Sequence, residues 1–192
     1  MIASSRKVFF DEVRRSLFNM KMNQGQVEGC NAILDFYQER HPCTLPQLAY
    51  ILATAYHETA STMQPIEEYG RGRGKKYGQG DPETGQRYYG RGYVQLTWKD
   101  NYAKQSKKLG LGDKLVTNPD AVMVKSVALA ILFGGSMDGD FTGKSLSHYI
   151  NDDACDFRNA RKVINGLDRA EDIEKYANRF LLALGKNGNI SG

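Results

Sequence analysis

The chain of 192 residues has a mass of 21.5 kDa, with 41% hydrophobic and 25% charged residues. This length gives room for one domain with a sizeable core, and the composition excludes a disordered or fibrous chain. The 26 basic residues exceed the 22 acidic ones by only four. Such a mild excess permits attraction to an anionic cell wall or nucleic acid without establishing it.

The cysteines and the N-terminal residues indicate in which compartment the protein is made. Cys30, Cys43 and Cys155 form no CxxC pair and leave one thiol over in any pairing, which favours free, mostly buried thiols over a disulfide framework. The N-terminus is charged where a signal peptide needs an apolar stretch, and no 18 apolar residues run together. We therefore expect synthesis in a cytoplasm and no stable membrane insertion.

The chain up to about Met63 is predicted to be helical. Apolar residues recur at helical spacing through the first forty residues. A second, largely buried helix is predicted to begin at Thr44, which has capping-box spacing to Gln47. Pro65 disfavours helical geometry at the residue before it, so this helix is expected to end near Met63.

The segment 69–98 differs in kind from its surroundings. Eight of the 20 glycines lie between positions 70 and 92, and five of the 11 tyrosines between 69 and 93. Residues 81–85 are typical of a turn, and the following QRYYGRGYVQLTW favours an extended arm. A β-hairpin is therefore predicted here, followed by further helices, the last two around 157–165 and 170–184.

Glu58 is the most informative single residue. It is the first formal charge after 17 uncharged positions and lies near the end of the predicted buried helix. A buried carboxylate is costly unless it is paired, neutralised or functional, and burial favours the protonated form that a general acid requires. The alternative is a structural glutamate bridged to an arginine of the hairpin. The residues alone leave both interpretations open.

The sequence gives little support for a zinc site, a Ser/His/Asp triad or a nucleotide-binding loop. His57 and Glu58 would open an HExxH zinc motif, but the fourth position after His57 is Ser61. No Ser/His/Asp arrangement can be assembled with confidence from His41, His57 and His148. The string GRGRGKKYGQG lacks dinucleotide-binding spacing, and no Walker loop occurs. No metal or cofactor is therefore predicted.

The basic residues of the predicted hairpin allow three interpretations. Interleaved arginines and tyrosines are typical of RNA-binding Arg/Gly segments, but also of a solvated ribbon without a ligand, or of one wall of a polysaccharide cleft. The buried acid just upstream favours the cleft over nucleic acid. The residues concerned are Arg71, Arg73, Lys75, Lys76, Arg87 and Arg91.

Two strings together resemble a known family. AYHETASTMQPIEEYG followed by YYGRGYVQLTWKDNY is similar to the core signature of glycoside hydrolase family 19, a lysozyme-like group that contains chitinases and many bacteriophage endolysins. Upstream, VRRSLFNMKMNQGQVEGCNAILDFY resembles the phage and bacterial branch, and RKVINGLDRAEDIEKY extends the resemblance downstream. The resemblance implies a mainly α, two-lobed lysozyme-like fold with a Gly/Tyr-rich β-hairpin beside the cleft. We expect one catalytic domain over residues 1–192, with 1–42 packed on it as an N-terminal helical segment and 69–98 inserted as the hairpin.

The resemblance also assigns roles to residues. It makes Glu58 the catalytic acid and gives Thr97, a serine in plant-type members, a hydroxyl that could hold the attacking water. Gln95, Asn101 and Asn165 become substrate contacts. The remaining candidates for substrate contact are His57, Glu67, Tyr89 and Arg91.

A second carboxylate is expected, because the inverting mechanism of this family needs a base about 6.5 to 9.5 Å from the acid. Glu67, Glu68 and Glu83 are the candidates, and the Pro-x-x-Glu spacing from Pro65 resembles that of phage-type relatives, which implies Glu68. Chitinases of the family place this glutamate in a longer insertion near Gly80, and carry a cleft arginine near Asp172. Both departures make chitin-type substrate contacts doubtful.

The expected function is hydrolysis of β-1,4 glycosidic bonds in bacterial peptidoglycan by a monomer without cofactor or nucleic-acid partner. An endolysin of this kind would be made in the host cytoplasm and reach the wall after another protein permeabilises the membrane. A chitinase and a lytic transglycosylase, in which one acid suffices, remain alternatives. A non-catalytic protein that binds the cell wall or nucleic acid is the alternative from another class.

Overall fold

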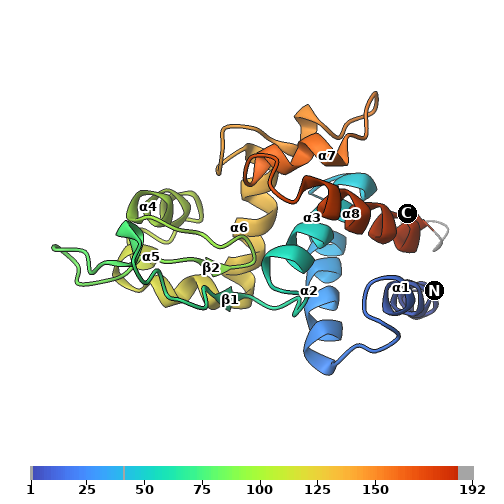
Figure 1. Ribbon diagram of the computed structural model, residues 1–192, viewed down its shortest axis with the longest axis horizontal. Helices are drawn as coiled ribbons and strands as arrows, with labels where there is room; N and C mark the ends of the chain where they lie inside the picture. The colour runs from blue at the N-terminus through green and yellow to red at the C-terminus, as the bar shows by residue number, and fades with distance from the viewer. Residues whose placement is uncertain (1, 41, 186–192) are drawn as a thin grey trace.

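The computed structural model describes residues 2–40 and 42–185, with side chains from residue 6 onward. His41, one of the three histidines considered above, therefore lies outside the described residues. The described chain is mainly helical and contains one small antiparallel strand pair (Figure 1). Its α-helices are α1 Ile2–Ser16, α2 Gln24–Arg40, α3 Leu45–Glu58, α4 Lys99–Lys108, α5 Lys114–Thr117, α6 Lys125–Asp138, α7 Phe157–Ala160 and α8 Ala170–Gly185. The strands are β1 Ile66–Glu67 and β2 Arg91–Gly92, and the short 3₁₀ helices are η1 Lys76–Gly78, η2 Pro119–Met123, η3 Leu146–His148 and η4 Arg161–Val163.

Figure 1 shows two lobes joined by α6. In one lobe α3 packs along α8, which also contacts α1 and α7. The other lobe holds the strand pair, α4, α5 and η2. The α6 helix contacts α3 on one side and η2 on the other. The predicted mainly α, two-lobed architecture with a small hairpin is confirmed.

Helix α3 begins as predicted but ends earlier. The backbone N–H of Thr44 donates to Gln47 Oε1 at 2.9 Å, as the capping box requires. The last helical residue is Glu58, not one near Met63, so that prediction is wrong. Ala60 and Ser61 both adopt positive φ and turn the chain away five residues before Pro65. The early end leaves Glu58 at the helix terminus rather than within a continuous helix.

Helix α2 holds the turn that follows Glu58. Gln26 Nε2 donates to the Ser61 carbonyl at 3.0 Å, and Gln64 Nε2 donates to the Gly25 carbonyl. Gly29 faces the same turn, and a Cβ built on it would lie 1.8 Å from the Met63 carbonyl oxygen. Only glycine allows α2 to approach the turn this closely, and the position of Glu58 depends on that approach.

The hairpin is shorter than predicted. Among the described residues, β1 and β2 are the only strands that pair, with Ile66 opposite Gly92 and Glu67 opposite Arg91, and successive turns occupy the segment between them. The expected turn at 81–85 is present, closed by Gly85 N–H donating to the Asp81 carbonyl at 2.8 Å. The β-favouring residues of the second arm pack into the core instead of forming a long strand; they are Tyr88, Tyr89, Tyr93, Val94 and Leu96.

The cysteines differ in exposure. Cys30 is buried, Cys43 is half-buried and Cys155 is exposed, so the expectation of mostly buried thiols is wrong for Cys155. Burial raises the pKa of Cys30 to about 12. Among the described residues, no helix is both long and apolar enough to cross a membrane.

Replacing Gly29 should destabilise the protein. The new Cβ of Gly29→Ala would collide with backbone, which has no rotamer to escape, so the free energy of unfolding should fall by about 2 kcal/mol or more. Gly25→Ala is the matched control, because its Cβ meets no atom closer than 3.4 Å and alanine favours helix. Urea titrations of both variants measure the difference, and equal stability would show that the α2 contact is not needed.

Candidate active site

Glu58 forms an ion pair with an arginine distant in sequence. The Arg161 Nη1 atom lies 2.6 Å from Glu58 Oε1, and the Arg161 side chain is only 3% exposed. The Glu58 side chain retains 16% exposure, so the protein does not enclose it completely. The structural alternative, in which Glu58 is bridged to an arginine, is thus met in part: the arginine belongs to η4 and not to the hairpin.

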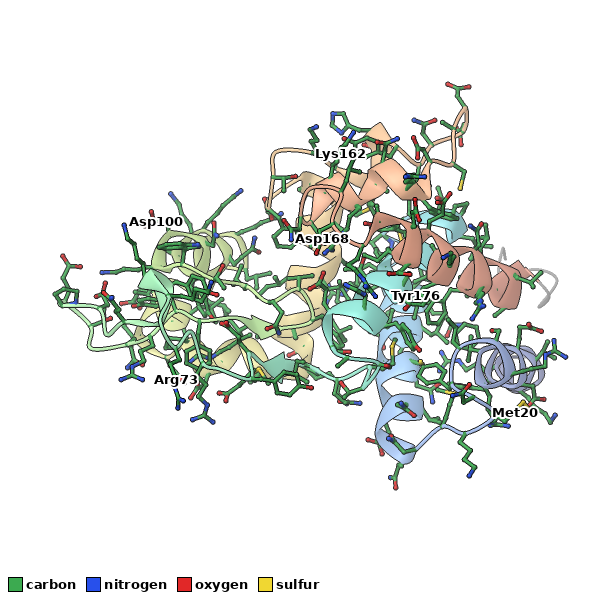
Figure 2. The ribbon with its side chains drawn as sticks, in the orientation of Figure 1. Met20, Arg73, Asp100, Lys162, Asp168 and Tyr176 are labelled. Carbon is green, nitrogen blue, oxygen red and sulfur yellow. The ribbon has the colours of Figure 1, made fainter. Side chains whose placement is uncertain are left out.

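Arg161 is fixed from two sides. Its Nε atom donates to the Asp168 carbonyl at 3.0 Å, and its own carbonyl accepts from the Asn165 N–H at 3.0 Å. Figure 2 shows Asp168 in the loop that leads into α8, beside the end of α3. A guanidinium held in this way can orient the carboxyl group of Glu58. Sequence reasoning missed Arg161, although it lies in the RKVINGLD string used for the resemblance.

Two buried hydroxyl groups lie on the same side of α3. Tyr50 and Thr54 precede Glu58 by eight and four residues, so the three share one face of the helix. The Tyr50 and Thr54 hydroxyl oxygens are both buried, and the two side chains interact with each other. Burial raises the pKa of Tyr50, and the nearby charge of Arg161 opposes that shift. The ion pair therefore lies over a polar patch inside the core.

His57 is half-buried beside Glu58. Its ring centroid lies 6.4 Å from that of Tyr176 on α8, which is labelled in Figure 2. Burial lowers the pKa of His57 below 6.5, and the positive charges of Arg161 and Arg169 act in the same direction, while Glu58 opposes them. The ring is therefore neutral at pH 7.

Glu67 and Glu68 contact different tyrosines. Glu67 accepts from the Tyr89 hydroxyl at 3.0 Å and pairs with Arg71 at 2.8 Å. Glu68 accepts from the Tyr77 hydroxyl at 3.1 Å and from the Gly90 N–H at 3.1 Å. Both of these Glu68 donors are neutral, whereas Glu67 is neutralised by a guanidinium.

The Arg91 side chain forms an ion pair and hydrogen bonds within the protein. Its Nε pairs with Asp120 at 2.9 Å, and its Nη1 donates to the Tyr102 hydroxyl and to the carbonyls of Arg87 and Tyr89. The guanidinium carbon lies 3.7 Å from the centroid of the Tyr89 ring. These contacts fasten the second arm of the hairpin to α4 and η2.

Gln95, Thr97 and Asn101 lie in and after a turn rather than along a strand. Gln95 has a positive φ, and its Nε2 donates to the carbonyls of Ile66 at 3.2 Å and Gly92 at 3.4 Å. Asn101 Nδ2 donates to the Thr97 carbonyl at 2.9 Å. The extended arm predicted here is wrong, although Gln95 and Thr97 are both half-buried, as an alternation of faces would make them.

Three more residues were singled out from the sequence: Asn165, Asp172 and Glu83. Asn165 is exposed one turn after Arg161. Asp172, where chitinases carry a cleft arginine, pairs with Arg169 at 2.8 Å. Glu83 is 81% exposed at the hairpin tip and pairs with Lys99 at 2.6 Å.

The structure thus forms two groups of candidates. His57, Glu58, Arg161 and Asn165 lie at the end of α3, and a second group surrounds β1 and β2, made of Glu67, Glu68, Tyr89 and Gln95. No hydrogen bond or ion pair joins the two groups in the described part of the chain. Within residues 2–40 and 42–185, no cluster of three or more His, Cys, Asp or Glu residues is placed to hold a metal ion.

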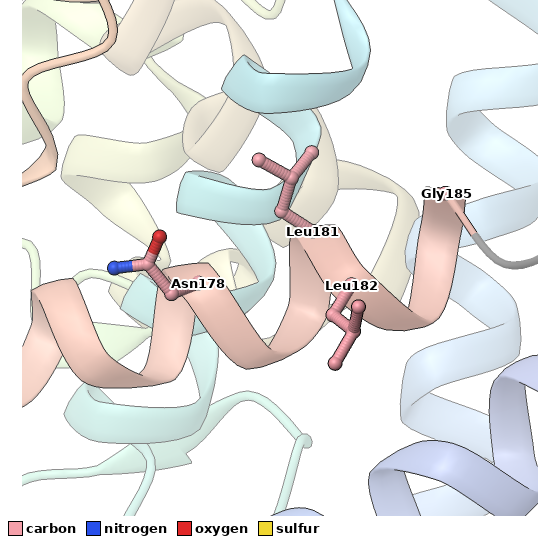
Figure 3. Close-up of a pocket in the computed structure, with 4 residues that line it drawn as sticks. All are labelled: Asn178, Leu181, Leu182 and Gly185. Atoms are coloured by element: carbon pink, nitrogen blue, oxygen red, sulfur yellow. The ribbon is translucent and has the colours of Figure 1, made fainter.

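A shallow hollow on α8 lies apart from both groups. Asn178, Leu181, Leu182 and Gly185 line it, at the opposite end of α8 from Asp172 (Figure 3). None of these residues was predicted to act on a substrate, and Asn178 is the one polar side chain among them.

Part of this chain is similar in sequence to known proteins. Residues 49–137 match the family model described as chitinase class I, a glycoside hydrolase family 19 model. An acidic 26 kDa endochitinase of Solanum lycopersicum is 50% identical over 40 residues, which are 21% of this chain and 16% of that protein. An endochitinase of Arabidopsis thaliana is 42% identical over 77 residues, 40% of this chain and 26% of that protein. The matched segments thus span 16% and 26% of these two curated relatives.

The solved structures extend the likeness to nearly the whole chain. A bacterial family 19 chitinase superposes with a TM-score of 0.53 at 21% identity, covering 92% of this chain and 93% of the other. The chain has the family 19 fold. A mutant of a chitinase C superposes with a TM-score of 0.51 at 18% identity, covering 96% and 92% of the two chains. Glu58, Glu68, Thr97 and Asn101 all fall within the segment that matches the family 19 sequence model.

The lowered pKa of His57 predicts that the stability of the folded protein depends on pH. The pKa of His57 is lowered by folding, so the unfolded chain binds a proton more readily and stability falls as the pH drops below about 6.5. His57→Gln should reduce this slope between pH 7 and pH 5, which for one histidine is at most about 1.4 kcal/mol per pH unit. Urea titrations across this range measure it. His148→Gln, at an exposed histidine, is the control, and an equal effect of both variants would contradict the assignment.

Proposed function

We propose that the protein is a glycoside hydrolase that cleaves β-1,4 bonds of peptidoglycan with Glu58 as its general acid. The observation that carries this proposal is the Glu58 carboxyl group at the end of α3, which is only partly buried and is oriented by the buried Arg161. This residue lies within the segment that matches the family 19 model, in a chain with the family 19 fold.

The ion pair is compatible with acid catalysis. A general acid becomes negative as its proton moves to the leaving oxygen, and Arg161 lies 2.6 Å from the oxygen that would carry this charge. When Glu58 carries its proton in the ground state, a fixed positive group at that point stabilises the transition state more than the ground state. The same pair holds the carboxyl group in one orientation before substrate binds.

Glu68 is better suited than Glu67 to act as the base. A base must accept a proton from the attacking water, and a carboxylate already paired with a cation is weaker in this role. Glu67 is paired with Arg71, whereas Glu68 accepts, within the described part of the chain, from Tyr77 and the Gly90 N–H. Thr97 would hold the water, as the resemblance to family 19 implies.

The second part of the proposal concerns the substrate, for which we favour peptidoglycan over chitin. The upstream resemblance to the phage and bacterial branch supports peptidoglycan, as does the absence of a carboxylate at Gly80, where chitinases of the family carry their second glutamate. We propose that the protein acts as a monomeric endolysin, made in the host cytoplasm and reaching the wall after the membrane is opened. Chitin is the second candidate, because the relatives with matching segments are named endochitinases.

Three amide substitutions test the carboxyl groups. Glu58→Gln should lower the release of reducing ends from peptidoglycan about 10²- to 10⁴-fold, because the amide has no proton to give. Glu68→Gln should also cause a large loss, whereas Glu67→Gln should retain most of the activity. Circular dichroism of each variant controls for folding. Near-native activity of Glu58→Gln would overturn the assignment of the acid, and full activity of Glu68→Gln that of the base.

The products of the wild-type digestion complete this test. Hydrolysis adds one water to each cleaved bond, whereas a lytic transglycosylase leaves a 1,6-anhydro end without it. Mass spectrometry of digested peptidoglycan distinguishes the two, and parallel digestion of chitin establishes which polymer is preferred. Anhydro products would contradict hydrolysis.

A further inference from the structure

The string GRGRGKKYG forms a compact turn structure rather than an open ribbon. Successive N–H to carbonyl bonds join Arg71 to Glu68, Arg73 to Gly70 and Lys75 to Gly72, each at 2.9 Å. The segment closes on itself where two glycines meet. A Cβ on Gly72 would lie 2.5 Å from the Gly78 Cα, and a Cβ on Gly78 would lie 2.0 Å from the Gly72 carbonyl oxygen. These glycines let the chain return against its own backbone.

Tyr77 fastens this turn structure to the rest of the lobe. Its hydroxyl donates to Glu68, and its carbonyl accepts from the Tyr88 N–H at 3.1 Å. Its ring packs edge-on against Trp98, with the centroids 5.4 Å apart. The segment 71–76, which we name the cationic loop, is therefore anchored at its end beside Glu68.

The cationic loop carries charge that the protein does not neutralise. Arg71 pairs with Glu67, but Arg73, Lys75 and Lys76 are exposed and form no ion pair within the described residues. Figure 2 shows Arg73 at the outer edge of the lobe that carries the strand pair. Just before the loop, the Tyr69 side chain is 86% exposed and offers an aromatic face.

We propose that the cationic loop binds the stem-peptide carboxylates of a peptidoglycan strand whose sugars run past Glu68. This inference rests on the proposed function and deepens it, because it gives a reason for selection of an anionic glycan over neutral chitin. The chemistry matches: the three unpaired cations attract carboxylates, and Tyr69 can stack on a sugar ring. Because the loop is held by the Gly72 and Gly78 contact, binding requires little ordering of its backbone.

Co-sedimentation with insoluble polymers tests this proposal separately from catalysis. All proteins carry Glu58→Gln so that the polymer is not digested. The loop variant adds Arg73→Gln, Lys75→Gln and Lys76→Gln. The control variant adds instead Lys107→Gln, Lys114→Gln and Lys144→Gln, three exposed lysines on other elements, so that the net charge of the two variants is equal.

The polymers are peptidoglycan stripped of teichoic acid, the same material with its carboxyl groups amidated, and chitin. The loop variant should bind native peptidoglycan at least about threefold more weakly than the parent, because each exposed charge contact contributes a factor of about 1.4 to 5. This difference should shrink at high salt and vanish on amidated peptidoglycan and on chitin. The control variant should bind like the parent.

Other outcomes would overturn the proposal. Equal binding of the parent to native and amidated peptidoglycan would remove the carboxylates as ligands, and equal weakening by the control variant would assign the effect to net charge. Tighter, loop-dependent binding of duplex DNA than of peptidoglycan would show a nucleic-acid surface instead. Failure of the wild-type protein to release reducing ends from any polymer would contradict the proposed function and leave the binding result to be judged by itself.

Discussion

The ion pair between Glu58 and Arg161 is the contact on which the arrangement of the site depends. It joins the end of α3 to the segment before α8, residues 103 positions apart in the chain. A buried guanidinium is costly unless it is paired and hydrogen-bonded; here Nη1 of Arg161 pairs with Glu58 and Nε donates to the Asp168 carbonyl. The packing of α3 along α8 and the orientation of the proposed acid are thus maintained together.

The surrounding structure keeps that pair at a surface. Gly29 and Gln26 of α2 hold the turn after Glu58, so the chain leaves α3 abruptly and runs into β1. The strand pair then places Glu67 and Glu68 on the other lobe, each bonded to a tyrosine. A substrate that reached both lobes would meet an oriented acid on one side and a carboxylate with neutral donors on the other. The cationic loop follows directly after this carboxylate.

Part of this arrangement could be predicted from sequence because its causes are local. The capping box at Thr44 and Gln47 and the turn at 81–85 depend on residues three or four apart. An uncharged run that ends in a carboxylate was enough to single out Glu58. Other features depend on contacts between distant residues. Nothing in the sequence around Arg161 indicates that it pairs with Glu58, because the two residues meet only when α8 packs on α3. The end of α3 depends on contacts with α2 and not on Pro65 alone. The arm after Arg87 has β-favouring residues, but the core takes their side chains and no long strand forms.

A double-mutant cycle on Glu58 and Arg161 tests the central claim most directly. The free energy of unfolding is measured by urea titration for the wild type, Glu58→Gln, Arg161→Met and the double variant. Each single substitution leaves a buried or half-buried group without its partner, so the two effects should be coupled by at least about 1 kcal/mol, with the double variant more stable than the sum of the singles predicts. Additive effects, within about 0.3 kcal/mol, would contradict an ion pair that holds the site together.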